Sequence, residues 1–260
     1  TYGSLQTVKI ENMRNQHTEI LEEAAGHPAE QEAVRKVAPP EKKYGFVSVC
    51  AGDGISAVFR ALGVDGIISG GQTMNPSTED MLKAIERVNA ENIFILPNNK
   101  NIIMAAQQAR DLTEDKNIIV IPSRTVPQGI TALVNFMPDL GPEENTRTMT
   151  EEMGNVRTAQ ITYAVRTTNI DGIDIEEGDI MALGDHGILA VGKSVDGVAL
   201  EAMKEMLDDE SELVTIYYGA DVSEHEAKVL EEQAQEQYPD KEIELQYGGQ
   251  PIYYYLISAE

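Results

Sequence analysis

The chain of 260 residues contains one cysteine and no tryptophan, and no apolar run is long enough to cross a lipid bilayer. A lone Cys50 cannot form a disulfide within the chain, which is typical of proteins from a reducing cytoplasm. No signal-peptide pattern is present, and we therefore expect a cytoplasmic protein without a transmembrane segment. The chain starts at Thr1 rather than at a methionine, so we expect it to be part of a longer protein.

Basic residues are also scarce. Lys and Arg number 20 and Asp and Glu number 44, so the formal net charge at pH 7 is −24. An acidic surface repels nucleic-acid phosphates and anionic lipid headgroups. Nucleic-acid binding is therefore not expected, whereas attraction of a basic partner is. The length suits one large domain or two small ones with a substantial core.

Motifs for nucleotide chemistry, acyl transfer and metal binding are missing from the sequence. There is no P-loop pattern, no G-x-S-x-G elbow and no protein-kinase motif set. The histidines are His17, His27, His186 and His225. No two of them lie at metal-ligand spacing from each other, and none lies at such spacing from the cysteine. The sequence thus predicts no catalytic residue, no metal site and no cofactor within this chain.

The hydrophobic pattern divides the chain into three parts. Residues 1–43 predict a lead-in and linker, residues 44–137 a parallel α/β lobe, and residues 138–260 an α+β lobe. In the middle part, the expected strands are 46–50, 65–68, 92–96 and 117–121, and the expected helices are 54–62, 77–88, 99–112 and 127–136. Near-continuous apolar strands are typical of parallel strands covered on both faces. The predicted fold class is therefore α/β, with a doubly wound parallel sheet and right-handed crossovers.

The last part of the chain has a different pattern, with short strands joined by turns that contain Gly and Asp. Its expected strands are 159–167, 179–183, 188–191, 213–218, 242–246 and 252–257, and its expected helices are 198–207 and 223–237. This order of elements predicts a second lobe of the α+β class.

Four polar loops follow the carboxyl ends of the predicted parallel strands, at residues 51–54, 70–73, 97–101 and 122–125. We call them the strand-end loops. Open α/β sheets bind ligands in the crevice beyond those strand ends. Glycines permit close approach of a backbone, and the first N–H groups of a following helix can receive an anion. These loops are therefore the predicted site of ligand or partner recognition.

The candidate recognition residues all lie in or beside the strand-end loops. They are Gly70, Gly71, Gln72, Thr73, Asn75, Asn98, Asn99, Lys100, Ser123 and Arg124, with Gly52 and Asp53 as weaker candidates. A structural interpretation stands beside the functional one, because such loops are usually polar and Asn, Ser and Asp cap helices. Lys100 and Arg124 suit a phosphate or carboxylate, or else are solvated cations. Asp53 suits a helix N-cap better than a ligand.

Several segments carry a resemblance to a known family. They read Val49-Cys50-Ala51-Gly52-Asp53-Gly54, the run Ser69–Asp80, Ile95-Leu96-Pro97-Asn98-Asn99-Lys100-Asn101 and Val120-Ile121-Pro122-Ser123. With them the chain resembles, over essentially its whole length, the C-terminal domain of the bacterial fatty acid kinase subunit FakA. That family is also described as DAK2 domain-containing or dihydroxyacetone kinase-like.

The resemblance implies a two-lobed fold similar to DegV proteins and to the dihydroxyacetone kinase substrate subunit. It also implies a longer, homodimeric protein whose N-terminal kinase domain, outside this chain, holds ATP and magnesium. That kinase phosphorylates fatty acids carried by FakB, a DegV-family protein, to acyl phosphates for phospholipid synthesis.

One departure from the DegV pattern concerns the second lobe. DegV proteins close their lipid site with a His-Thr-Gly-Pro-Gly type loop, whereas the corresponding loop here is Tyr247-Gly248-Gly249-Gln250-Pro251, without histidine. The leading hypothesis is therefore a non-catalytic domain that docks FakB. The alternatives are binding of a small phosphorylated or carboxylate ligand at the strand-end loops, and direct binding of a fatty acid.

Overall fold

The computed structural model describes residues 39–71, 74–170 and 172–260. The predicted lead-in lies outside the described residues as far as residue 38, and the candidates Gln72 and Thr73 lie outside them too.

The first sheet contains four parallel strands. They are β1 (Lys42–Cys50), β2 (Gly66–Ser69), β3 (Ala90–Leu96) and β4 (Asn117–Val120), in the order β2-β1-β3-β4. The central strand β1 is buried from Tyr44 to its end, as expected for an apolar strand covered on both faces. The predicted doubly wound parallel sheet is confirmed.

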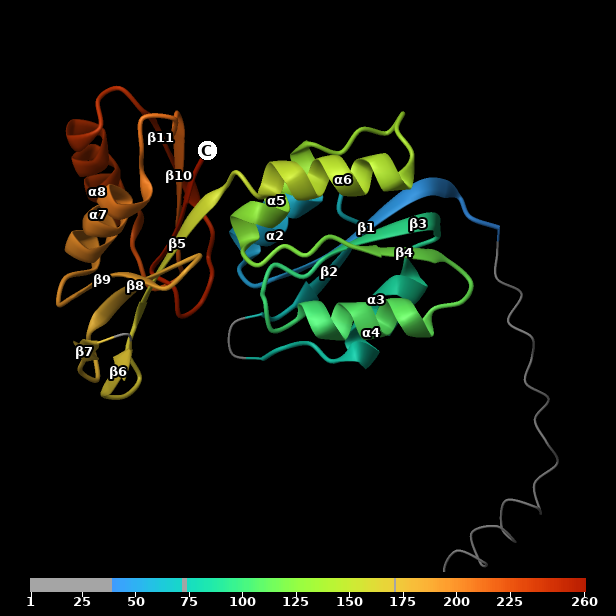
Figure 1. Cartoon of the computed structure of the whole chain (residues 1–260), viewed down its shortest axis with the longest axis horizontal. Coiled ribbons are helices and arrows are strands. Elements are labelled where there is room, and N and C mark those ends of the chain that lie inside the picture. The colour runs from blue at the N-terminus through green and yellow to red at the C-terminus, as the bar shows by residue number, and fades with distance from the viewer. Residues whose placement is uncertain (1–38, 72–73, 171) are drawn as a thin grey trace, which may run out of the picture. The chain divides into compact units, whose positions relative to one another are not determined.

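Helices cover both faces of the first sheet (Figure 1). The helices α2 (Asp53–Ala61), α5 (Val126–Val134) and α6 (Pro142–Met153) pack on one face, and α3 (Thr78–Arg87) and α4 (Ile103–Leu112) pack on the other. The predicted lobe boundary at residue 138 places α6 in the second lobe, whereas its buried side chains pack on the first sheet. The strand order reverses between β1 and β3. The crevice typical of this fold therefore lies between the loops that follow these two strands.

The start of α3 agrees with the helix predicted from residue 77, because Ser77 is its N-cap. The Ser77 hydroxyl accepts a hydrogen bond from the backbone N–H of Asp80 at 3.2 Å, and the Asp80 carboxylate accepts one from the backbone N–H of Ser77 at 2.9 Å. This reciprocal pair is a capping box. It holds the end of the loop that leaves β2 and so helps to place one of the strand-end loops.

The second sheet is mixed. Its strands are β5 (Arg157–Tyr163), β8 (Ile180–Gly184), β9 (Ile188–Gly192), β10 (Leu213–Tyr218), β11 (Glu242–Tyr247) and β12 (Tyr255–Ala259). They lie in the order β11-β10-β12-β5-β8-β9, and the pair β10–β11 is parallel while the other pairs are antiparallel. Helices α7 (Val195–Met206) and α8 (Glu224–Gln237) pack against this sheet, which confirms the predicted α+β lobe.

Several strand boundaries differ from the prediction, among them two in the second sheet. The strand expected to reach residue 167 ends at Tyr163, and a hairpin that the sequence analysis missed follows it, formed by β6 (Thr168–Ile170) and β7 (Ile173–Ile175). The strand expected from residue 252 begins at Tyr255. The reason is a turn, because Ile252 has φ 73° and the N–H of Tyr253 donates to the carbonyl of Pro251 at 2.8 Å.

The two sheets share part of one hydrophobic core. Tyr217 of β10 and Leu256 of β12 are 6% and 4% exposed, and they belong to the same buried cluster as Phe46 and Phe94 of the first sheet. Thr131 of α5 also donates a hydrogen bond to the Glu260 carboxylate at 2.7 Å. Residues 39–260 accordingly form one compact unit.

Candidate functional site

The loops that leave β2 and β3 meet across the end of β1. The side-chain amide of Asn99 donates a hydrogen bond to the carbonyl of Gly71. The Asn99 Oδ1 also accepts a hydrogen bond from the backbone N–H of Asn101 at 2.9 Å. The first of these contacts places Gly71 and Asn99 side by side. It follows from the shared edge at which parallel strands end.

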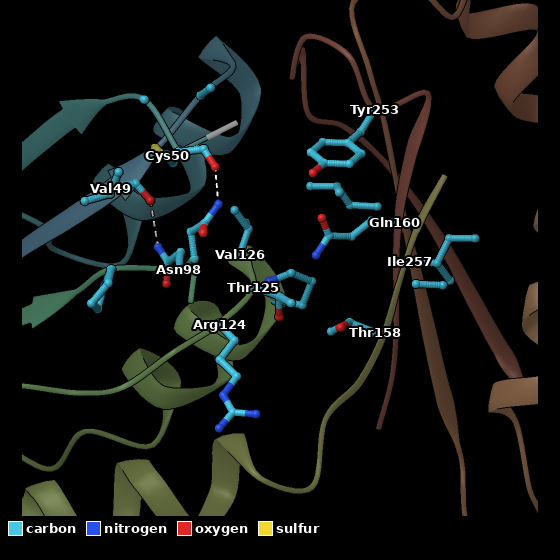
Figure 2. Close-up of a pocket in the computed structure, with 18 residues that line it drawn as sticks. Val49, Cys50, Asn98, Arg124, Thr125, Val126, Thr158, Gln160, Tyr253 and Ile257 are labelled. Atoms are coloured by element: carbon cyan, nitrogen blue, oxygen red, sulfur yellow. Dashed lines mark hydrogen bonds between the residues drawn. The ribbon is translucent and has the colours of Figure 1, made fainter. Parts of the chain in front are cut away.

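Two of the candidate residues lie beneath the strand-end loops in a buried hydrogen-bond network. Asn98 is 7% exposed and Ser123 is 0% exposed. The Asn98 amide donates to Ser48 Oγ and to the Val49 carbonyl, both at 2.9 Å, and its Oδ1 accepts from Ser123 Oγ at 2.7 Å. Figure 2 shows the bond between Asn98 and Val49. The polar atoms of Asn98 are therefore engaged inside the protein.

Other candidates face solvent. Asn75, Lys100 and Arg124 are exposed. In Figure 2 the guanidinium of Arg124 is directed away from Gln160 and Tyr253, while its backbone N–H donates to Gln128 Oε1 at 2.9 Å. These side chains are available to a partner that approaches from outside. The nearby Met104 is also exposed, at 69%.

The weaker candidates, Gly52 and Asp53, lie against a loop of the second sheet. The N–H of Ile55, in the first turn of α2, donates to the carbonyl of Gly248 at 3.0 Å. A Cβ atom added to Gly52 would lie 2.3 Å from that carbonyl oxygen, and Gly52 has φ 102°, so only glycine fits there. The close approach of the two backbones explains why position 52 is a glycine.

Asp53 is not the helix N-cap that the sequence suggested, because Gly52 holds that position and Asp53 is the first helical residue. A hydrogen bond to the Asp53 carboxylate raises the pKa of the Tyr247 hydroxyl, and the negative charge of Asp53 adds to that effect. The residue thus joins the two sheets. Its hydrogen bond is made to Tyr247, the last residue of β11, where the loop over residues 247–251 begins.

A small cavity of ≈ 30 Å³ lies between the strand-end loops and the second sheet. Gln160 of β5 and Tyr253 face the loops across it (Figure 2). Ligand pockets for small molecules usually measure about 300–1,000 Å³, and a water molecule occupies about 30 Å³. The cavity therefore has room for about one water and not for an acyl chain.

Sequence reasoning missed the second-sheet residues around this cavity. Thr158, Gln160 and Thr162 alternate along β5 with Ala159 and Ile161. Alternation of this kind normally indicates one face in solvent. Here Thr158 is 2% and Thr162 is 5% exposed, because the polar face of β5 packs toward the first sheet. The signal was present in the sequence, but its usual interpretation was wrong.

A larger groove of ≈ 1170 Å³ is bordered by residues of both sheets. It is lined on the first-sheet side by Ile103, Arg124 and Met153, and on the second-sheet side by Arg157, Asp185, His186, Ile188, Leu189, Glu205, Met206, Asp208, Glu210 and Glu260, among others. We call it the inter-sheet groove. Of the candidates from the sequence, Arg124 lines it.

Within residues 39–71, 74–170 and 172–260, no group of three or more His, Cys, Asp or Glu side chains is placed to hold a metal ion. Over the same ranges, none of the helices combines the length and the apolar character needed to traverse a bilayer.

Comparison with solved structures identifies the fold. A DegV family protein, Cg2579 from Corynebacterium glutamicum, matches with a TM-score of 0.61 and 13% identity, over 85% of this chain and 97% of that protein. The Streptococcus pneumoniae fatty acid kinase B3 protein, solved with linoleic acid, matches with a TM-score of 0.55 and 12% identity, over 84% of this chain and 99% of that protein. The dihydroxyacetone kinase from C. freundii, solved with AMP-PNP and Mg²⁺, matches with a TM-score of 0.56 and 14% identity, over 97% of this chain and 57% of that protein. The fold is thus DegV-like and dihydroxyacetone kinase-like.

Comparison of sequences identifies the family. Protein YloV of Bacillus subtilis (strain 168) is 45% identical over 260 residues, which cover 100% of this chain and 46% of YloV. The chain therefore spans about half the length of this relative. The profile of the FakA-like C-terminal family, which is named for the FakA component of fatty acid kinase, matches residues 45–260. The chain belongs to this family of C-terminal parts of FakA-like fatty acid kinase proteins.

Proposed function

We propose that this chain is the partner-recognition part of a fatty acid kinase. It docks FakB, the acyl-carrying protein, so that a kinase domain elsewhere in the full-length protein reaches the fatty acid carboxylate. Family membership supports the kinase context. The observation that carries the proposal is the small cavity between the strand-end loops and the second sheet, which measures only ≈ 30 Å³.

The small volume of this cavity argues against binding of a fatty acid beneath the strand-end loops. The S. pneumoniae protein with the same fold was solved with linoleic acid, but a chain of that size does not fit a cavity of one water molecule. Opening the cleft would expose buried side chains such as Leu256. Burial of one apolar side chain of this size stabilises the fold by about 1.5–3 kcal/mol. Binding of a lipid there would have to offset the loss of several such contributions.

The same region is poorly suited to a small anion. A helix N-terminus is a common anion site because its first N–H groups are unpaired. In α2, however, the N–H of Ile55 is already hydrogen-bonded to the Gly248 carbonyl. Asn98 and Ser123 bond to each other. The exposed Lys100 and Arg124 are the feature that favours the small-ligand alternative.

Docking contributes to catalysis by proximity. Holding the acyl carrier against the kinase domain turns an encounter between two proteins into a step within one complex, which lowers its entropic barrier. In this proposal the ATP and magnesium lie in the N-terminal kinase domain, and the product is an acyl phosphate for phospholipid synthesis. We extend the proposal to a cytoplasmic, homodimeric full-length kinase.

The test measures three binding reactions of the 260-residue chain by titration calorimetry. The titrants are acyl-loaded FakB, free oleate and inorganic phosphate. Binding of acyl-loaded FakB without measurable binding of oleate or phosphate is the expected result. Oleate binding at micromolar concentration would favour the lipid-binding alternative, and phosphate binding that is lost in Lys100→Ala would favour the small-ligand alternative. Failure to bind FakB in any loading state would overturn the proposal.

A further inference from the structure

The inter-sheet groove is a concave surface, formed by described residues, on which the proposed docking can be argued. Its volume of ≈ 1170 Å³ is about forty times that of the small cavity beneath the strand-end loops. Small-molecule pockets usually stay below about 1,000 Å³. An α-helix with side chains is about 10 Å wide, so this volume accommodates about 15 Å of helix, or about ten residues. The groove thus has the size of a polypeptide segment.

The floor of the groove is apolar. Met153 and Met206 are 8% and 4% exposed and form its base, while Ile103, Ile188 and Leu189 are half-buried along it. Methionine is unbranched and polarisable, and it is common on surfaces that bind amphipathic helices. A half-buried apolar strip of this kind gains free energy when a partner's apolar stripe covers it.

The rim of the groove is acidic. Its acidic residues are Asp185, Glu205, Asp208, Glu210 and Glu260, against the two arginines Arg124 and Arg157.

Ion pairing within the groove does not neutralise the acidic residues of the rim. Arg157 forms an ion pair with Asp208 and donates to the Met206 carbonyl at 2.9 Å. Glu205 and Glu210 are exposed at the rim. An incoming segment therefore meets an apolar floor between negative charges.

We infer that the inter-sheet groove receives a basic amphipathic helix of the acyl-carrying partner. An apolar helical stripe fits the floor, and Lys or Arg residues beside that stripe complement Glu205 and Glu210. A second copy of this chain is a poor occupant, because each copy carries a formal charge of −24. The inference rests on the proposed docking function and names its surface.

The charge test compares two double variants that change the net charge equally. Glu205→Lys with Glu210→Lys alters the rim. The control, Glu232→Lys with Glu236→Lys, alters exposed acids on α8 that are not among the groove residues. Affinity for acyl-loaded FakB is measured by biolayer interferometry at low salt. The rim variant is expected to weaken binding at least tenfold and the control less than threefold.

The floor test uses Ile188→Thr, which keeps a β-branched side chain in β9 but removes apolar surface. Its control is Val165→Thr, because Val165 is 75% exposed and is not a groove residue. The floor variant is expected to weaken binding threefold to tenfold, and the control is expected to bind as the unaltered chain does. Thermal melting of all four variants establishes that each is folded.

Hydrogen exchange gives an independent readout on the unaltered chain. Bound FakB is expected to slow exchange of the backbone amides at residues 186–190 and 205–211. If the chain binds FakB, but the rim and control pairs weaken binding equally, or these amides exchange unchanged, the groove assignment is wrong and docking stands. If the unaltered chain does not bind FakB, both the proposed docking function and the groove assignment are wrong.

Discussion

The carbonyl oxygen of Gly248 accepts a hydrogen bond at 3.0 Å from the backbone N–H of Ile55. One residue belongs to a loop of the second sheet and the other to the first turn of α2. The bond occupies a helix N-terminus that would otherwise be open to an anion. It also brings two glycine-containing segments so close that no side chain fits between them.

The first prediction concerns this close approach. A Cβ atom added to Gly54 would lie 2.0 Å from the carbonyl oxygen of Tyr247. Gly54→Ala therefore forces the backbones apart and is expected to lower the free energy of unfolding by about 1–3 kcal/mol, as overpacking does. For a chain of this size the melting temperature should fall by about 2–4 °C per kcal/mol.

The control for Gly54→Ala is Gly197→Ala in α7. Its added Cβ would lie 3.5 Å from the Ser194 Cβ, an ordinary contact, and alanine is the better helix former. Its melting temperature is expected to stay the same or rise. A Gly54→Ala variant as stable as Gly197→Ala would mean that the loop is not seated on α2.

The second prediction separates the buried from the exposed candidates. Asn98→Ala removes the acceptor of the buried Ser123 hydroxyl and the side-chain donor to the Val49 carbonyl. Each unsatisfied buried group costs about 1–3 kcal/mol, so chemical denaturation should show a loss of at least that size. Lys100→Ala is exposed and should change stability by less than about 0.5 kcal/mol. Equal stability of the two variants would contradict the network.

The third prediction concerns acid stability. Hydrogen bonds from Arg157, and then from Ser211, lower the pKa of Asp208 from 3.8 to about 2. A carboxyl group whose pKa is lower in the folded state stabilises the fold above its unfolded pKa. That contribution is lost as pH falls from about 4 through about 2. Chemical denaturation between pH 7 and pH 2 should show this loss.

Asp208→Asn is the variant that tests the assignment. It should be less stable than the unaltered chain at pH 7, and the difference should shrink toward pH 2 as Asp208 itself becomes protonated. A difference that stays constant over the whole range would show that the charge of Asp208 is not responsible.

The fourth prediction concerns the rate of docking. With 44 acidic and 20 basic residues, the chain should attract a basic surface at long range, which mainly raises the association rate. The Debye length falls from about 10 Å at 0.1 M salt to about 3 Å at 1 M. Stopped-flow association with FakB should slow steeply over this range while dissociation changes little. A salt-independent association rate would exclude electrostatic steering.

Much of the first sheet and the position of the strand-end loops follow from local sequence. Apolar runs such as Asn92–Leu96, each followed by a helical segment, suffice to predict parallel strands. The Ser77 capping box marks a helix start within four residues. Because parallel strands end at one edge, the contact between Asn99 and Gly71 also follows. All these features depend on neighbours in sequence and on the geometry common to such sheets.

The division of the candidates into buried and exposed groups did not follow from the sequence. Asn98 and Asn99 are adjacent and chemically identical, yet one lies in a buried network and the other bridges two loops. The positive φ of Asn98, 54°, turns its side chain toward Ser48. A single backbone angle of this kind is set by tertiary packing and leaves no distinct pattern in composition or periodicity.

The sequence by itself determined the fold class, the acidic surface and the shared edge of the strand-end loops, because periodicity, charge and caps are local properties. Tertiary structure alone decided that only a small cavity lies beneath the strand-end loops and that a groove with an acidic rim lies elsewhere. The contact between Ile55 and Gly248 joins residues far apart in the chain, and the groove combines residues from Ile103 to Glu260. Such surfaces exist only after both sheets have packed on their common core.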